Sequence, residues 1–168
     1  MLKQINSLGI FFEDCYREIS VREYSRETKI SPPTASKILK DFERKGLLKK
    51  REERGFLFFR VNNENKDMID LSRVYWRNKL WSLIKYLEDT VYPKSLVLFG
   101  SLSKLEVRKE SDVDIIILGT SKKELRLEKF EKELGRKIHL FLYDSLDKVN
   151  KELRLNVING YILSGYLS

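Results

Sequence analysis

The chain has 168 residues, of which 42% are hydrophobic and 35% are charged, so it can form one ordinary domain or two small ones. Its net charge of +8 favours a polyanionic partner, most simply nucleic acid. Cys15 is the only cysteine, which excludes an internal disulfide and a zinc cluster. No apolar run approaches the roughly 20 residues that span a bilayer, so we expect a soluble, cytoplasmic protein with no membrane contact.

The first two predicted elements are helices. Apolar residues at helical spacing predict a helix over about 6–19. The segment Ser20–Glu23 then has the form of a capping box, with serine at the cap and glutamate three residues later. We therefore expect a second, short helix from Val21 to about Thr28.

A third helix and a hairpin follow. Ser31 is a good N-cap for a helix that begins with two prolines and runs to about Lys45, where Gly46 would end it. Two short runs, 47–51 and 56–61, flank a charged turn that contains glycine. This pattern predicts a β-hairpin.

Three helices followed by a hairpin resemble the winged helix-turn-helix domain of transcription regulators, over residues 1–62. In such domains the third helix enters the DNA major groove and the hairpin touches the backbone or the minor groove. These 62 residues hold 14 Lys and Arg against 9 Asp and Glu. The resemblance implies contacts with duplex DNA by Thr34, Ser36, Lys37, Lys40, Arg44, Lys49, Lys50, Arg51 and Arg54. A basic, solvated face on a protein-interaction domain is the alternative interpretation.

A polar stretch over residues 62–66 is a plausible linker. After it, apolar positions predict one long helix from about Asp67 to Thr90, ending before Pro93. This helix, or the first one, could form a dimer seam. We expect a homodimer, because winged-helix regulators usually read paired half-sites.

The stretch 95–118 is the most informative part of the chain. An apolar run, 96–99, and a second one, 115–118, each have the length and composition of a buried strand. Gly100-Ser101 ends the first run, where the glycine would let backbone N–H groups approach a phosphate and Ser101 would add a hydroxyl at a helix start.

Asp112 and Asp114 open the second strand. Because strand side chains alternate, both carboxylates point to one face, where they repel each other unless a cation lies between them. Ligation by oxygen alone suits Mg²⁺, which is usually held by one or two carboxylates and substrate phosphates.

Strand, Gly-Ser, spacer and Asp-x-Asp in this order resemble the signature of the polymerase-β-like nucleotidyltransferase superfamily, in its small, minimal branch. The resemblance covers Lys66 to the C-terminus. It implies that Asp112 and Asp114 bind Mg²⁺ and act in catalysis, and that Gly100 and Ser101 bind a nucleoside triphosphate.

The chain departs from this family at two positions. Leu105 stands where the family often has glycine. Active members also carry a third carboxylate on a later strand, whereas the matching strand, Lys137–Leu142, has His139 at that position. A neutral or cationic imidazole does not replace an Mg²⁺ ligand simply. His139 is therefore either a site residue or a structural histidine, and Asp144 is a weak substitute for the missing acid.

The remaining segments complete a small mixed sheet with flanking helices. We expect a helix over Lys122–Leu134 stopped by Gly135, a strand over Ile138–Leu142, a helix opened by Asp144-Ser145 and a docked apolar end over 156–167. The predicted fold class is α+β, with a winged helix domain over 1–62 and a mixed-sheet α/β nucleotidyltransferase-like domain over 66–168.

Two functions fit this sequence. The first is a DNA-binding transcriptional regulator whose nucleotidyltransferase-like domain binds Mg²⁺-nucleotide or a protein partner, with weak or no catalysis. The second is an active Mg²⁺-dependent nucleotidyltransferase that modifies a hydroxyl of a protein, an RNA or a small molecule. Single-domain relatives that adenylylate a partner toxin make the second an antitoxin-like interpretation.

Overall fold

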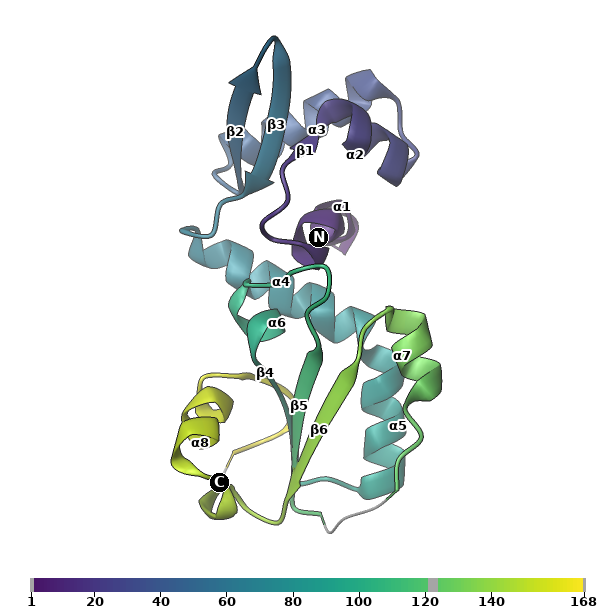
Figure 1. Ribbon diagram of the computed structural model, residues 1–168, viewed down its shortest axis with the longest axis vertical. Helices are drawn as coiled ribbons and strands as arrows, with labels where there is room; N and C mark the ends of the chain where they lie inside the picture. Colours follow the sequence, from purple (N-terminus) through teal and green to yellow (C-terminus); the bar gives the residue numbers. More distant parts are fainter. Residues whose placement is uncertain (1, 121–123, 168) are drawn as a thin grey trace. The chain divides into compact units, whose positions relative to one another are not determined.

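The computed structural model describes residues 2–120 and 124–167, and its chain forms two compact units (Figure 1). The N-terminal unit comprises residues up to Ser72 together with Leu105–Arg108. The C-terminal unit comprises Arg73–Lys104 and the residues from Lys109 onward. The chain therefore passes from the first unit to the second within one helix, and later contributes four residues to the first unit again.

The N-terminal unit begins with α1, Leu2–Glu13, then β1, Ile19–Ser20, and α2, Val21–Thr28. The predicted first helix is wrong at its end, because Ile19 belongs to a strand and pairs with Phe59. The predicted capping box is confirmed. Ser20 Oγ accepts a hydrogen bond from the Glu23 N–H, and the Glu23 carboxylate accepts one from the Ser20 N–H at 2.8 Å.

The third helix, α3, spans Pro32–Arg44, and Ser31 caps its N-terminus as predicted. The hairpin is also confirmed: β2, Leu48–Glu53, pairs antiparallel with β3, Phe56–Val61. Arg54 and Gly55 both have positive φ and form the two-residue turn that suits the twist of a hairpin. Together with β1 the hairpin makes a three-stranded sheet of order β1-β3-β2.

The prediction of one long helix is wrong, because this segment forms two helices. α4 spans Lys66–Lys79 and α5 spans Trp81–Val91, with Leu80 between them at φ −86° and ψ 3°. Hydrogen bonds continue on both sides of the break, from the Leu80 N–H to the Trp76 carbonyl and from the Ile84 N–H to the Leu80 carbonyl. Leu80 therefore joins the end of α4 to the start of α5 through its own N–H and carbonyl.

The C-terminal unit contains a mixed sheet, as predicted, but the sheet has four strands where the sequence pattern predicts three. Its strands are β4, Ser95–Phe99; β5, Val113–Leu118; β6, Ile138–Tyr143; and β7, Tyr161–Gly165. The order is β6-β5-β4-β7, with β5 and β6 parallel and the other pairs antiparallel. Strand β7 lies where the sequence pattern predicts only a docked apolar segment.

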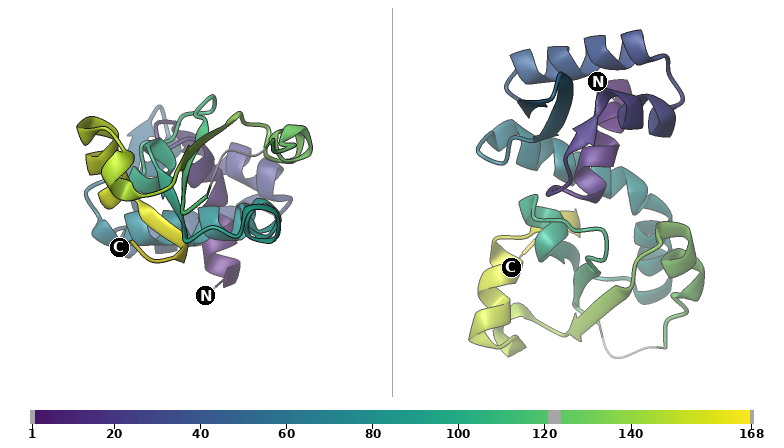
Figure 2. Two further views of the ribbon diagram at one scale, coloured as in Figure 1. Left: turned by 90° about the horizontal axis from the view of Figure 1, so that it is seen from below. Right: turned by 45° about the horizontal axis from the view of Figure 1, so that its top comes forward.

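Helices lie on both sides of this sheet (Figures 1 and 2). They are α5, described above; α6, Ser101–Lys104; α7, Glu128–Leu134; a 3₁₀ turn, η1, Leu146–Lys148; and α8, Lys151–Ile158. The helix predicted from Lys122 begins only at Glu128, and Lys122 itself lies outside the described residues. Gly135 ends α7 with φ 65°, as expected. The helix predicted after Asp144-Ser145 is only the short turn η1.

One face of the sheet packs against α8 and the segment before it. Phe99, Ile116 and Leu118 on this face form a core with Val149 and Val157, and Phe141 and Tyr143 pack against that core. Side chains of the opposite face, such as Leu98 and Ile117, are completely buried too. Of the helices in the described part of the chain, none is long and apolar enough to cross a membrane.

Candidate functional site

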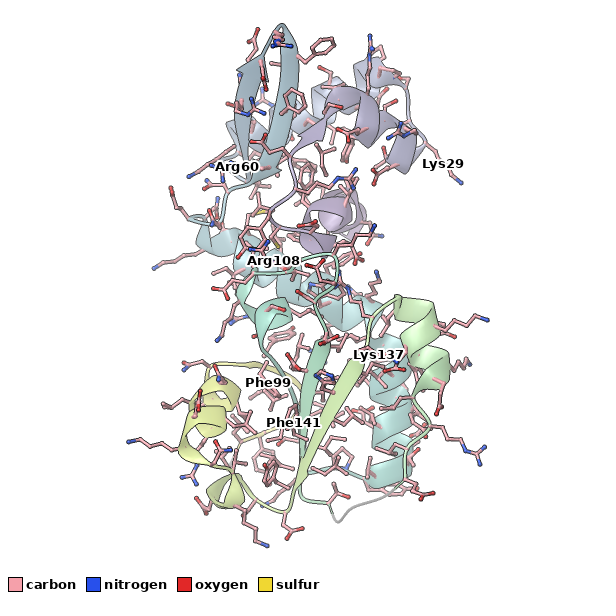
Figure 3. The ribbon with its side chains drawn as sticks, viewed as in Figure 1. Lys29, Arg60, Phe99, Arg108, Lys137 and Phe141 are labelled. Carbon is pink, nitrogen blue, oxygen red and sulfur yellow. The ribbon has the colours of Figure 1, made fainter. Side chains whose placement is uncertain are left out.

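Three neighbouring strands place the predicted site residues side by side. Phe99 of β4 pairs with Asp114 of β5, and Asp114 pairs with His139 of β6. Directly opposite residues in paired strands point to the same face, so these three side chains form a row across the sheet. The rings of Phe99 and Phe141, labelled in Figure 3, lie 5.4 Å apart on this same face.

Gly100 lies directly against the Asp114 carboxylate. Its φ is +69°, and a Cβ at this position would lie 2.4 Å from Asp114 Oδ2. The backbone therefore requires glycine for two reasons, its left-handed conformation and the close approach of the carboxylate. Ser101 follows as the first residue of α6, so Gly100, Ser101 and Asp114 meet where β4 ends.

The carboxylates of Asp112 and Asp114 both lie near the imidazole of His139. His139 Nδ1 is 3.4 Å from Asp114 Oδ1 and 3.9 Å from Asp112 Oδ2. Asp114 is the most enclosed of the three side chains, at 26% exposed against 40% for Asp112 and 53% for His139. Burial raises the pKa of the Asp114 carboxyl above its usual value, opposed by the nearby His139 and reinforced by the charge of Asp112.

Sequence reasoning missed a buried arginine that supports this site. Arg136 is only 7% exposed, and its Nη1 donates a hydrogen bond of 2.6 Å to the carbonyl of Ser111, the residue before Asp112. Its guanidinium lies over the ring of Trp76, 5.2 Å from the centroid. An arginine two residues before a strand gives no signal of such a contact in the sequence, because Ser111 lies 25 residues away.

Leu105, the residue that departs from the family pattern, has a φ of +60°. This conformation favours glycine and costs other residues roughly 1–2 kcal/mol. The side chain is nevertheless buried, at 3% exposure, so its packing offsets the backbone strain. Leu105 thus has the backbone conformation that a glycine would adopt easily, although its side chain differs from the glycine often found at this position in the family.

The donor set determines which ion the site can hold. No cluster of three or more His, Cys, Asp or Glu side chains within residues 2–120 and 124–167 is arranged to hold a metal. Asp112 and Asp114 provide two oxygen donors on one edge, which fits an Mg²⁺ ion that takes its remaining ligands from phosphate and water. At the position of the family's third carboxylate, His139 supplies a nitrogen atom, which does not fit the preference of Mg²⁺ for oxygen ligands. Asp144 lies beyond the end of β6 and pairs with Lys148, so it does not join the site.

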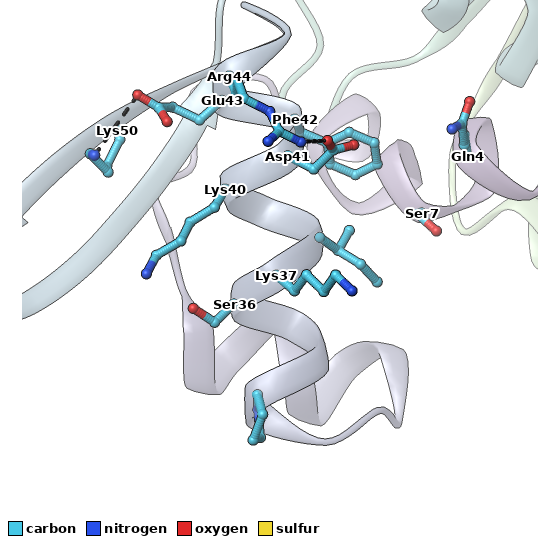
Figure 4. Close-up of a pocket in the computed structure, with 12 residues that line it drawn as sticks. Gln4, Ser7, Ser36, Lys37, Lys40, Asp41, Phe42, Glu43, Arg44 and Lys50 are labelled. Atoms are coloured by element: carbon cyan, nitrogen blue, oxygen red, sulfur yellow. Dashed lines mark hydrogen bonds and ion pairs between the residues drawn. The ribbon is translucent and has the colours of Figure 1, made fainter.

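The residues predicted to contact DNA lie on α3 and on the hairpin. Thr34, Lys37, Lys40 and Arg44 are exposed on α3, and Ser36 is half-buried. An open pocket of about 1240 Å³ runs along α3. Figure 4 shows the side chains of Ser36, Lys37 and Lys40, which line this pocket, projecting from the helix. Arg54 lies at the hairpin turn, and Lys50 of β2 lies at one side of the pocket.

Many of these basic groups already have acidic partners. Lys49 pairs with Glu64 at 2.7 Å, Lys50 with Glu43 at 3.8 Å, and Arg44 with Asp41. Arg51 is held by Glu18 and Glu53 and lies over the ring of Phe58. By contrast, Lys37 and Lys40 have no ion pair with any residue that the structure describes. These two lysines are therefore the cations of α3 that an added polyanion would meet first.

Comparison with known proteins identifies one region. Residues 82–164 match the family model described as Polymerase beta, Nucleotidyltransferase. The match spans β4, β5, β6 and all of β7 except Gly165, and it includes Gly100, Asp114 and His139. It supports a nucleotidyltransferase fold for this part of the chain. No curated protein and no solved structure matches the chain.

Proposed function

We propose that this protein is a DNA-binding transcriptional regulator whose nucleotidyltransferase-fold region binds a magnesium nucleoside triphosphate and catalyses transfer weakly or not at all. The observation that carries the nucleotide part is that Asp114 lies against Gly100 while Asp112 and Asp114 both lie within 4 Å of His139, the histidine at the position of the third acid. The match of residues 82–164 to a nucleotidyltransferase family supports it.

Different residues of the site would bind the metal ion and the phosphates. Asp112 and Asp114 hold Mg²⁺, and the turn at Gly100 and Ser101 receives the terminal phosphates. Bound Mg²⁺ would neutralise negative charge on the triphosphate. Gly100 keeps the Asp114 carboxylate in place, because it leaves room for Oδ2 where any other residue would put a Cβ.

His139 is the reason to expect poor catalysis. Its Nδ1 lies 3.4 Å from Asp114, in the place where active relatives add a carboxylate. An imidazole supplies no negative charge, and when protonated it competes with a metal ion for the same carboxylates. Activation of the attacking hydroxyl should therefore suffer more than binding of the nucleotide.

Two sets of variants test the nucleotide function. Asp112→Asn combined with Asp114→Asn should abolish Mg²⁺-dependent binding of ATP, CTP, GTP and UTP in calorimetric titrations. Asp144→Asn is the matched control, since it removes an exposed carboxylate that pairs with Lys148, and it should bind like the wild type. A wild type that binds no nucleotide would refute the proposal.

The catalytic part has a separate test. His139→Asp should raise, or create, transfer of labelled nucleotide onto a hydroxyl of the protein or of partners that purify with it. Rapid turnover by the wild type that His139→Asp slows would favour the second candidate function, an active nucleotidyltransferase acting on a protein, an RNA or a small molecule. The observation that favours this second function is that the chain has both the Gly-Ser pair and the Asp-x-Asp pattern.

The DNA-binding part rests on the order α1-β1-α2-α3-β2-β3 and on the charge of α3. This order is that of a winged helix-turn-helix domain, in which the third helix enters the major groove. Lys37 and Lys40 stand on the exposed side of α3, three residues apart, so both can reach phosphates at once. A homodimer would present two such helices to a palindromic site.

Salt dependence tests this part. The logarithm of the affinity for duplex DNA should fall with the logarithm of salt concentration with a slope of about −0.9 per phosphate neutralised. Replacing Lys37 and Lys40 by alanine should weaken binding and make the slope shallower by about 1 to 2. Arg17→Ala is the control, because Arg17 lies outside the predicted DNA-contacting set and Glu27 already holds its guanidinium. Binding that ignores salt, or no binding to genomic fragments at low salt, would contradict DNA recognition.

A further inference from the structure

The spacer between the two motifs of the site passes out of the unit to which both motifs belong. Gly100 and Ser101 precede the spacer and Asp112 follows it, and all three lie in the C-terminal unit. Leu105–Arg108, in the middle of the spacer, belongs instead to the N-terminal unit, which also contains α3 and the hairpin. Each motif is therefore only a few residues away from a segment of the unit proposed to bind DNA.

Specific contacts hold Leu105–Arg108 in the N-terminal unit. The Val107 carbonyl accepts a hydrogen bond of 2.8 Å from the N–H of Cys15, in the loop after α1. The Arg108 guanidinium lies over the ring of Tyr16, 4.2 Å from its centroid. The side chain of Val107 is completely buried. A backbone hydrogen bond, a cation–π contact and a buried side chain therefore hold this segment against the loop after α1.

The two ends of the spacer are held in the C-terminal unit. Ser103 donates from its N–H and its hydroxyl to the Gly100 carbonyl, at 3.2 and 2.9 Å. At the other end, Arg136 donates to the Ser111 carbonyl. Leu105, where the spacer enters the N-terminal unit, has the left-handed φ of +60°, a conformation that persists only when the surrounding structure enforces it. The spacer is thus restrained at both ends and in the middle, so a change at either motif acts on its middle segment.

The loop after α1 leads directly to the elements proposed to bind DNA. In this loop, Glu18 pairs at 2.7 Å with Arg51 of the hairpin, one of the residues predicted to contact DNA. Directly after it, Ile19 pairs with Phe59 of β3 and Ser20 caps α2. The loop that contacts the spacer therefore also positions the hairpin and the start of α2.

We propose that Leu105–Arg108 transmits occupancy of the nucleotide site to the DNA-binding unit, so that the protein binds DNA more tightly when Mg²⁺-nucleotide is bound. This inference rests on the proposed function and adds the regulation of its site. The two states differ in whether the hydrogen bond between Cys15 and Val107 is formed or open. A nucleotide that contacts both motifs restrains both ends of the spacer, which favours the state with this hydrogen bond formed.

The sign and the symmetry of the effect follow from thermodynamics. A first ligand that orders the spacer and the loop after α1 reduces the entropy that the second ligand has to remove, so the effect is positive. Because the two affinities are linked, DNA must tighten nucleotide binding by the same factor by which nucleotide tightens DNA binding.

Reciprocal titrations of the whole protein test this regulation. Fluorescence anisotropy would give the affinity for a labelled random-sequence duplex at low salt, with and without the Mg²⁺ complex of whichever of ATP, CTP, GTP and UTP binds best. Calorimetry would give the affinity for that nucleotide with and without the duplex. Nucleotide should tighten DNA binding about five-fold or more, and the duplex should tighten nucleotide binding by the same factor.

Two variants locate the effect in the spacer. Val107→Ala combined with Arg108→Ala removes buried apolar surface and the cation–π contact, so each ligand should still bind alone while the factor falls to about one. Lys109→Ala is the matched control, because it removes an exposed positive charge from the next residue, outside the segment, and it should keep the factor of the wild type. Amide hydrogen exchange gives a direct readout. Nucleotide should slow exchange of the Cys15 N–H in the wild type and not in the double variant.

The outcomes distinguish this inference from the proposed function. If both ligands bind the wild type but neither changes the affinity for the other, the regulation is overturned and the proposed function stands. The same holds if the double variant keeps the full factor, or if nucleotide weakens DNA binding equally in both proteins through charge repulsion. A wild type that binds no nucleotide, or no DNA, overturns both the proposed function and the inference.

Discussion

Replacing Gly100 by alanine tests the geometry of the site. A Cβ at Gly100 would lie 2.4 Å from Asp114 Oδ2 and 3.3 Å from its Cγ, while real Cβ contacts essentially never fall below 3.0 Å. The Asp114 carboxylate must therefore move away, and it carries the proposed Mg²⁺ ligand with it. Gly135→Ala is a matched control, because Gly135 has a φ of +65° and a Cβ added there would meet no atom within 4 Å.

Both variants should lose stability by a similar amount. A non-glycine residue in the left-handed region costs roughly 1–2 kcal/mol, and this cost applies at both positions. For a unit of this size, 1 kcal/mol corresponds to a fall of about 4–8 °C in the melting temperature. Gly100→Ala should lose somewhat more than Gly135→Ala, because Asp114 also has to be displaced.

Only Gly100→Ala should lose function. Thermal unfolding and Mg²⁺-ATP titration would be measured on both variants and on the wild type. We expect Gly135→Ala to bind nucleotide like the wild type and Gly100→Ala to bind at least about ten-fold more weakly, the equivalent of one lost charged contact. Equal nucleotide binding by the two variants would refute the claim that Gly100 positions the Asp114 carboxylate.

Three further predictions concern the N-terminal unit and assembly. Ser20→Ala should lower the free energy of unfolding by about 1 kcal/mol in chemical denaturation, because it removes the cap of α2; an unchanged midpoint would show that the cap contributes nothing. The hydrogen bond from the Ser20 N–H lowers the pKa of Glu23 below its usual 4.5, so its stabilisation is present above that value and disappears as the pH falls through the lowered pKa. Glu23→Gln should remove this acid-dependent loss, and a denaturation midpoint with the same acid dependence in both proteins would contradict it. Light scattering should give the mass of a dimer at micromolar concentration, and a monomer both free and on DNA would refute the homodimer.

The site was predictable from the sequence because its signals are local. Asp112 and Asp114 show their shared face through strand alternation alone, and Gly100 follows directly after an apolar run. The capping box at Ser20 and the hairpin were predictable for the same reason, since each lies within a short segment. Neighbouring positions in the chain determine such features with little help from the rest of the fold.

The features that were missed depend on tertiary context. Leu80 is completely buried and falls in register with the apolar positions before and after it, so periodicity could not show the break between α4 and α5. Strand β7 pairs with β4, which precedes it by more than 60 residues, and its short apolar run fits a helix equally well. The hydrogen bond between Cys15 and Val107 joins segments far apart in the chain and has no motif.

The proposed function requires a metal-nucleotide complex to bind at Asp112 and Asp114. The chain has a single histidine, His139, whose imidazole therefore gives its own resolved proton resonances. Its Nδ1 lies within 4 Å of both carboxylates. A paramagnetic Mn²⁺ ion that replaces Mg²⁺ at this site would broaden those resonances strongly, because paramagnetic relaxation falls steeply with distance.

The decisive measurement is an NMR titration of the wild type with ATP and substoichiometric Mn²⁺. We predict that the His139 resonances broaden, that excess Mg²⁺ reverses the broadening, and that the variant with both Asp112→Asn and Asp114→Asn shows none. Histidine resonances that stay sharp in the wild type, or that broaden equally in the double variant, would contradict the claim that these two aspartates bind the metal-nucleotide complex.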